Sequence, residues 1–276
     1  GNTVVNVTNA QIGNNVFGGG QKATVTGDTD VDIISSQINK KVFGGGDEAA
    51  VSGETTVDIN GSNVLGAVYG GGNQGALGAN VTDKYTATIK VFNSSDIATV
   101  YGGGAAAALN GQIMIDVDNS TIASIYGAGE GQASNVTQTT DVDVSDSTVN
   151  KIYGGGYAGD IAGDIMIGVK RCTITDSIYG AGQGEQAVSS GDTEVSIVDS
   201  TVATNVFGGG DAGELGGTAN VFVTNTIVGE NVYGGGNNAD VDESTSIIFY
   251  EGSTAKVVYG GGNNGNVGTT TSVEVL

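Results

Sequence analysis

The sequence of 276 residues contains no histidine, no proline and no tryptophan, and it has one arginine and one cysteine. Without histidine there is no imidazole base, so a Ser-His nucleophile is excluded and the commonest general acid–base group of enzymes is missing. With Arg171 as the only arginine, we expect no enzymatic activity and assign no catalytic residue. The single cysteine, Cys172, excludes an internal disulfide.

Basic residues are also scarce. Lys and Arg number 9 against 30 Asp and Glu, which gives a formal net charge of -21. Such a chain repels phosphate backbones and anionic lipids, so nucleic acid and bare membrane are poor partners, whereas cations are better ones. Since no run of about 18 apolar residues occurs, we expect no direct insertion into a membrane.

Glycine, by contrast, is abundant, and its 50 residues follow a repeat. The pattern [VI]-[YF]-G-[GA]-G occurs ten times, at spacings of 26, 26, 32, 25, 27, 26, 28, 26 and 26 residues. Such a period is typical of structural units that stack on one another. We therefore predict one elongated domain over residues 1–276. Because the chain begins and ends inside the repeat, we expect it to be a segment of a longer protein.

Each repeat carries short strand signals. Upstream of the aromatic residue lies a triplet with a β-branched residue at each end and any residue between them, such as Val31-Asp32-Ile33, which is typical of a half-buried strand. With the [VI]-[YF] pair and a later apolar position such as Val51, each repeat offers three short strands. These stack most simply as about ten coils of a parallel β-helix, right-handed because parallel crossovers prefer that hand. The predicted fold class is all-β.

Two columns of small residues predict corners. The first and third glycines of the trio never change, while the middle one becomes Ala128 and Ala181. Such positions need a positive φ or a close backbone approach. A second corner is predicted where hydroxyl side chains can bond nearby backbone. That column contains Ser36, Ser62, Ser95, Ser120, Ser147, Cys172, Ser200, Thr226 and Ser253, with Cys172 as a serine substitute.

The aromatic column is a candidate binding strip. Neighbouring strand residues point to opposite faces, so we expect one ladder of the [VI]-[YF] pair to lie outside, and the tyrosine hydroxyls favour the rings. The candidate ligand-binding residues are Tyr69, Tyr101, Tyr126, Tyr153, Tyr179, Tyr233 and Tyr259, which would stack against sugars or a neighbouring rod. The favoured alternative is that the rings cover the glycine corners and stack coil upon coil.

A group of aspartates is a candidate metal site. Asp28, Asp30 and Asp32 supply the oxygen ligands that Ca²⁺ prefers, although a solvated acidic face is the favoured interpretation. No other cofactor or metal is expected. A threonine ladder that binds ice or mineral is a further possibility, but threonines do not hold one column through all coils.

The 32-residue spacing contains six extra residues, between Leu77 and Tyr85. We expect them to project as the one substantial loop, because absorbing them in a strand would shift the inward side chains. Asp83, Lys84 and Tyr85 are candidate ligand-binding residues there, since loops on rigid scaffolds concentrate such groups. The favoured alternative is an insertion without a role.

The "VYGGGN" and "STI" repeats resemble the Gly-rich parallel β-helix repeats of large bacterial surface proteins, including adhesin and autotransporter-type stalks. The resemblance implies an extracellular, cell-attached setting. We therefore expect a non-enzymatic structural or adhesive rod, with glycans or proteins of host or cell surfaces, or neighbouring rods, as partners. The alternative is a carbohydrate-binding or carbohydrate-active β-helix protein that acts on polysaccharide.

Overall fold

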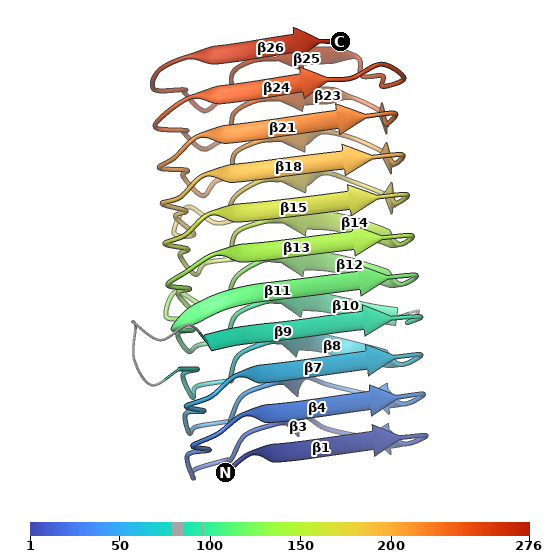
Figure 1. Ribbon diagram of the computed structural model, residues 1–276, viewed down its shortest axis with the longest axis vertical. Coiled ribbons are helices and arrows are strands. Elements are labelled where there is room, and N and C mark those ends of the chain that lie inside the picture. The colour runs from blue at the N-terminus through green and yellow to red at the C-terminus, as the bar shows by residue number, and fades with distance from the viewer. Residues whose placement is uncertain (79–84, 95) are drawn as a thin grey trace.

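The computed structural model describes residues 1–78, 85–94 and 96–276, and it is a parallel β-solenoid of about ten turns (Figure 1). Successive coils lie about 26 residues apart, and all the strand pairs of the described residues are parallel. No helix in the described part of the chain is long and apolar enough to span a membrane. The predicted all-β parallel solenoid is thus confirmed, while its right-handed sense stays a prediction.

The first sheet has eleven strands, one from each successive pass of the chain, and they face the viewer in Figure 1. In order they are β1 (Thr3–Thr8), β4 (Thr29–Ile34), β7 (Thr55–Asn60), β9 (Tyr85–Phe92), β11 (Gly111–Asp118), β13 (Thr140–Ser145), β15 (Ile165–Lys170), β18 (Thr193–Val198), β21 (Ala219–Thr224), β24 (Thr245–Phe249) and β26 (Thr271–Val275).

The second sheet has fifteen strands and lies behind the first. Its strands are β2 (Gln11–Ile12), β3 (Val16–Phe17), β5 (Gln37–Ile38), β6 (Val42–Phe43), β8 (Asn63–Tyr69), β10 (Asp96–Tyr101), β12 (Thr121–Tyr126), β14 (Thr148–Tyr153), β16 (Thr173–Ile174), β17 (Ile178–Tyr179), β19 (Thr201–Val202), β20 (Val206–Phe207), β22 (Ile227–Val228), β23 (Asn231–Tyr233) and β25 (Val257–Tyr259).

The predicted triplets form the core side of the first sheet. In β4, Val31 and Ile33 are buried and pair in register with Val57 and Ile59 of β7. The polar residue between them, Asp32, points to the outer face. Alternation along each strand and register between strands therefore produce one continuous Val/Ile core.

The third side of each coil differs from the prediction. Instead of a strand, it has one bridging residue per coil, as in the parallel bridges from Val25 to Val51 and from Val51 to Leu77. The loop between the glycine trio and this residue is short, and it also bonds to the neighbouring coil through its backbone, as from the Asp47 N–H to the Gly20 carbonyl at 3.1 Å. The bridging residue is apolar in most coils and is Ser189 in one. The third predicted strand is thus one residue long.

The glycine trio forms its corner through close approach. None of these glycines has a positive φ. A Cβ on Gly45 would lie 2.7 Å from the backbone nitrogen of Gly72 in the next coil. Where alanine takes the middle position, the bond to the next coil is slightly longer: the N–O distances are 3.4 Å from Ala128 and 3.3 Å from Ala181, against 3.0 to 3.2 Å where glycine takes that position. The trio is glycine because successive backbones are packed against each other.

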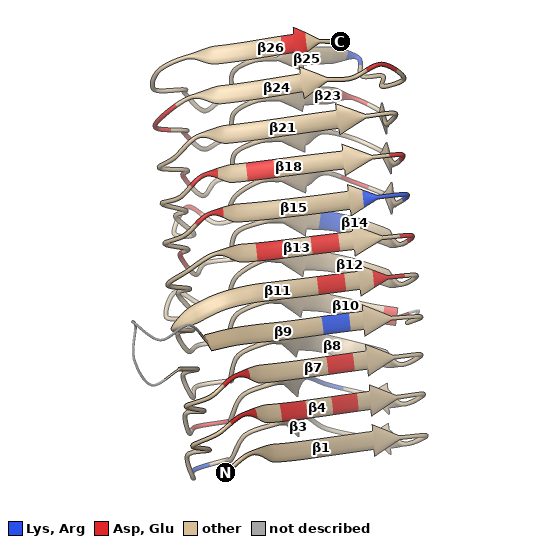
Figure 2. Cartoon of the chain, viewed as in Figure 1, with Lys and Arg blue, Asp and Glu red and all other residues tan. Residues whose placement is uncertain are grey.

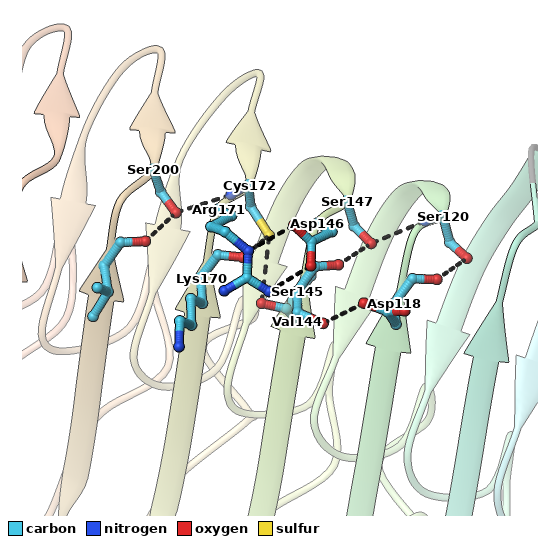
Figure 3. Close-up of polar contacts among 11 residues, drawn as sticks. Asp118, Ser120, Val144, Ser145, Asp146, Ser147, Lys170, Arg171, Cys172 and Ser200 are labelled. Atoms are coloured by element: carbon cyan, nitrogen blue, oxygen red, sulfur yellow. Dashed lines mark hydrogen bonds and ion pairs between the residues drawn. The ribbon is translucent and has the colours of Figure 1, made fainter.

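The second corner is built on a left-handed residue followed by the hydroxyl column. Asp146 and Arg171 have φ values of 48° and 54°. The hydroxyl residues form a ladder between coils (Figure 3): the Ser120 backbone N–H donates to Ser147 Oγ at 3.0 Å. Cys172 occupies the column, with its Sγ 3.4 Å from the Val144 carbonyl oxygen. This corner and its serine substitute match the prediction.

One member of the hydroxyl column was assigned incorrectly. Ser95 lies outside the described residues, and Ser94 makes the contacts of the column: it accepts the Ser62 N–H at 3.3 Å and donates to the Phe92 carbonyl at 3.1 Å. The reason is a register shift between Ile97 and Thr99, which offsets the lone apolar residue used for the alignment.

Candidate functional site

The aromatic residues form one stacked ladder. Ring centroids of successive coils lie 4.6 to 5.1 Å apart, as between Phe43 and Tyr69 and between Tyr69 and Tyr101, with interplanar angles of 12° in both pairs. The ladder runs from Phe17 to Tyr259 without a gap between coils. Its rings form a cluster separate from the Val/Ile core, on the other side of the strands. The favoured stacking interpretation is therefore realised.

The ladder is covered, which corrects the expectation that one column of the [VI]-[YF] pair is external. Tyr69 is 0% and Tyr153 is 1% exposed, and their strand neighbours are buried as well. The other buried candidates are Tyr101, Tyr126, Tyr179 and Tyr233. Only Tyr259, on the last aromatic rung, is 44% exposed. Because neighbouring rings occupy each other's faces, the faces of the buried tyrosines are closed to a stacking ligand.

A second column covers the rings. It consists of the first residue after each glycine trio, and its members are Gln21, Asp47, Asn73, Ala105, Glu130, Tyr157, Gln183, Asp211, Asn237 and Asn263. We call it the cover column. Toward both ends it forms amide–carboxylate pairs: Asn73 donates to Asp47 at 2.8 Å, and Asn237 donates to Asp211 at 2.8 Å. These bonds hold adjacent coils in register.

In the middle of the rod the cover column bonds to the rings. The Tyr69 hydroxyl donates to Glu130 Oε2 at 2.6 Å, and Lys41 Nζ lies 3.4 Å from the same oxygen and 5.0 Å from the Tyr69 ring centroid. Burial, followed by the hydrogen bond to Glu130, raises the pKa of Tyr69 far above its usual value. Tyr69 therefore stays a hydrogen-bond donor rather than becoming a phenolate.

Gln183 makes an equivalent contact further along the rod. Its Oε1 accepts a hydrogen bond from the Tyr126 hydroxyl, and burial raises the pKa of Tyr126 to about 12. Both contacts span two coils, because Glu130 follows the Tyr126 trio and Gln183 follows the Tyr179 trio. They tie together five consecutive tyrosine rungs.

The residues that make these contacts begin two longer loops. Val136 follows Gly129 by seven positions and Ser189 follows Gly182 by seven, whereas Val51 follows Gly46 by five. Both longer loops come after a Gly-Ala-Gly trio. The repeat spacings of 27 and 28 residues carried this signal. The sequence analysis did not identify these two loops, because one or two extra residues in a spacing are less conspicuous than the six-residue insertion.

Between the longer loops in chain order lies an exposed tyrosine that the sequence analysis also missed. Tyr157 is 48% exposed, and its ring packs edge-on against Tyr126 with centroids 6.0 Å apart. It lines a surface depression of about 390 Å³, which we call the Tyr157 depression. The other lining residues are Ala158, Gln183, Gly184, Glu185, Gln186 and Asp211.

A group of acidic residues lies on the outer face of the first sheet. Figure 2 shows them on β4, β7, β11 and β13, with Lys90 of β9 among them. Lys90 Nζ lies 4.0 Å from Asp58 Oδ1. Burial raises the pKa of Asp58, as it does that of Asp32, which also faces Asp30. This face therefore carries crowded carboxylates.

The calcium candidates do not converge. Asp30 and Asp32 lie on the outer face of β4, but Asp28 lies before the strand. Asp28 accepts the Glu54 backbone N–H at 3.0 Å and the Asn2 side-chain amide at 3.3 Å. Among the described residues, no group of three or more His, Cys, Asp or Glu could hold a metal ion.

The insertion is anchored at both ends. Leu77 is buried and bridges to Leu109, and Tyr85 is the half-buried first residue of β9, where it pairs with Gly111. Tyr85 is therefore part of the sheet. Asp83 and Lys84 lie outside the described residues.

Threonines do form a partial ladder. Thr121, Thr148, Thr173 and Thr201 are exposed and pair in register, and Ile227 ends the run. The column spans four coils of the second sheet. It was missed because the sequence search required a threonine in every coil.

No protein-family model, no curated protein and no solved structure matches this chain.

Proposed function

We propose that the chain is a rigid, non-enzymatic rod, which acts as a structural or adhesive segment of a bacterial cell-surface protein. The observation that carries the proposal is the doubled stacking: the Val/Ile core and the aromatic ladder both run through successive coils. Each coil is thus held by apolar packing on two sides of the second sheet. This construction favours a stiff spacer over a flexible linker.

Composition supports an exposed, non-catalytic role. The net charge of -21 favours solubility and repulsion between neighbouring chains. The only arginine, Arg171, makes a two-pronged contact with Asp146 at the second corner, with Nε to Oδ1 at 2.7 Å (Figure 3). Its guanidinium is therefore committed to a neighbouring coil.

The proposed setting is extracellular, and the proposed partners are glycans or proteins of host or cell surfaces, or neighbouring rods. Intact producing cells treated with an external protease provide the test. We expect the rod to be cut or released as completely as in lysed cells. Cleavage that requires lysis would overturn the cell-surface proposal.

The non-enzymatic part is tested separately. The purified chain is incubated with neutral and acidic polysaccharides, and new reducing ends are measured. We expect no release above that of buffer alone. Turnover that disappears on a point substitution in this chain would replace the proposed rod with the carbohydrate-active alternative.

A further inference from the structure

The Tyr157 depression arises where the cover column departs from its usual pattern. In the two flanking coils this column carries Glu130 and Gln183, which accept hydrogen bonds from tyrosine hydroxyls. Further along the rod it carries Asp211 and Asn237, which bond to one another. At Tyr157 it carries an aromatic ring, and the next coil carries one of the two longer loops. The ring and the loop together hollow the surface.

The walls of the depression are fixed by hydrogen bonds. The Tyr157 backbone N–H donates to the Gly129 carbonyl at 3.1 Å, and the Gly184 N–H donates to the Tyr157 carbonyl at 3.0 Å. The Tyr126 hydroxyl donates to the oxygen of the Gln183 amide, so the nitrogen of that amide still has hydrogens to donate. Asn237 similarly holds the Asp211 carboxylate. The polar groups are thus oriented before any ligand arrives, which lowers the cost of binding.

The side chains that line the depression indicate which class of ligand it can bind. Glu185 and Asp211 supply carboxylate oxygens, Gln183 and Gln186 supply amides, and none of the Lys and Arg residues that the structure describes lines the depression. Phosphorylated, sulfated or uronate ligands would meet only negative charge. Carboxylates and amides together both accept and donate hydrogen bonds, which suits a ligand covered with hydroxyls. The exposed ring of Tyr157 suits contact with the apolar C–H face of a sugar.

We propose that the Tyr157 depression binds a neutral hexopyranose unit of an oligosaccharide. The C–H face of the sugar stacks on Tyr157, while its hydroxyls bond to Glu185, Gln186 and Asp211. A volume of about 390 Å³ lies in the range of small-ligand sites. This inference rests on the proposed adhesive function, for which it names the ligand class. A lone aromatic face beside amides favours a sugar over an alkylammonium ion, which several aromatic faces would enclose.

Calorimetric or NMR titration of the intact chain with uncharged gluco-, galacto- and manno-oligosaccharides tests the proposal. We expect saturable binding to at least one of them, weakened tenfold or more by Tyr157→Ala and by Glu185→Ala. Tyr250→Ala is the matched control, because Tyr250 is 36% exposed but lies outside the depression, and we expect it to leave affinity unchanged. Thermal melting of each variant establishes that it is folded.

The dependence of affinity on ionic strength distinguishes a neutral sugar from an alkylamine. Affinity for a neutral sugar should stay within twofold between low and high ionic strength, whereas binding of an alkylamine would fall steeply. Binding to amines but to none of the neutral sugars would overturn the inference, as would sugar binding that Tyr157→Ala leaves intact.

The same experiments separate this inference from the proposed function. A chain that is exposed on cells yet binds none of the neutral sugars would overturn the sugar site alone. Tyr157-dependent sugar binding by a chain that is protected from external protease would support the site and overturn the cell-surface role.

Discussion

Glu130 accepts the hydroxyl hydrogen of Tyr69 at 2.6 Å, although the two residues are 61 positions apart and belong to coils separated by a third. Most other hydrogen bonds between coils join adjacent ones, as in the backbone bonds of the glycine corner. The contact therefore joins two coils across the one between them. Lys41 Nζ also lies 3.4 Å from the same carboxylate oxygen. Glu130 therefore contacts both Tyr69 and Lys41.

Tyr69→Phe should lower the free energy of unfolding by about 1 kcal/mol, because it removes a buried hydrogen bond to a charged acceptor and keeps the stacked ring. Chemical denaturation with a fluorescence or circular dichroism readout measures the change. Tyr259→Phe is the control, since its exposed ring should leave stability within about 0.5 kcal/mol. Equal effects of the two substitutions would contradict a structural role for the contact with Glu130.

Cys172→Ser should raise the free energy of unfolding by up to about 1 kcal/mol, because a hydroxyl is a better donor and acceptor than a thiol at this corner. The sulfur lies 3.3 Å from the Lys170 carbonyl oxygen and 3.4 Å from that of Val144, within reach of the contacts that serine makes in other coils. Denaturant midpoints of the two proteins provide the comparison. Ser120→Ala should have the opposite effect, and a destabilised Cys172→Ser would show that the pocket is shaped for sulfur.

Gly46→Ala should destabilise the rod by about 2 kcal/mol or more, and Gly45→Ala by less. The third glycine has no space, because its Cβ would meet the carbonyl of Ala49 in its own coil and lie 2.8 Å from that of Gly20. The middle position already accepts Ala128 and Ala181, with a slightly longer bond to the next coil. Thermal melting of the two variants tests the order, and a reversed order would contradict the close-approach explanation.

Asp141→Asn should stabilise the protein at neutral pH and have little effect below pH 3.8. Burial, followed by the charge of Asp143, raises the pKa of Asp141 above its usual 3.8. The folded state therefore binds this proton more tightly than the unfolded chain, so the contribution of Asp141 to stability falls as pH rises from 3.8 through the raised pKa. Denaturation of both proteins across this range measures it. If the stabilisation by Asp141→Asn increased toward low pH, the pKa of Asp141 would not be raised in the folded state.

The periodic part of the molecule was predictable because it depends on local spacing. Val31 and Ile33 alternate within one strand, and the glycine trio recurs with the aromatic ring, so coil and core follow from the sequence. The contact of Glu130 with Tyr69 was not predictable, because it joins a loop to a ring two coils away. The Tyr157 depression was not predictable either, because it depends on how the neighbouring longer loop lies in space.

The stacked coils also determine how the rod should yield to a mechanical load. A coil peeled from either end would release about 26 residues, or roughly 90 Å of extended chain, so pulling on the termini should give evenly spaced force peaks. The contacts of Glu130 with Tyr69 and of Gln183 with Tyr126 overlap, and together they connect the five tyrosine rungs from Tyr69 to Tyr179. These central coils should unfold last and in larger steps than the terminal coils. The terminal coils should therefore unfold first under a sudden load.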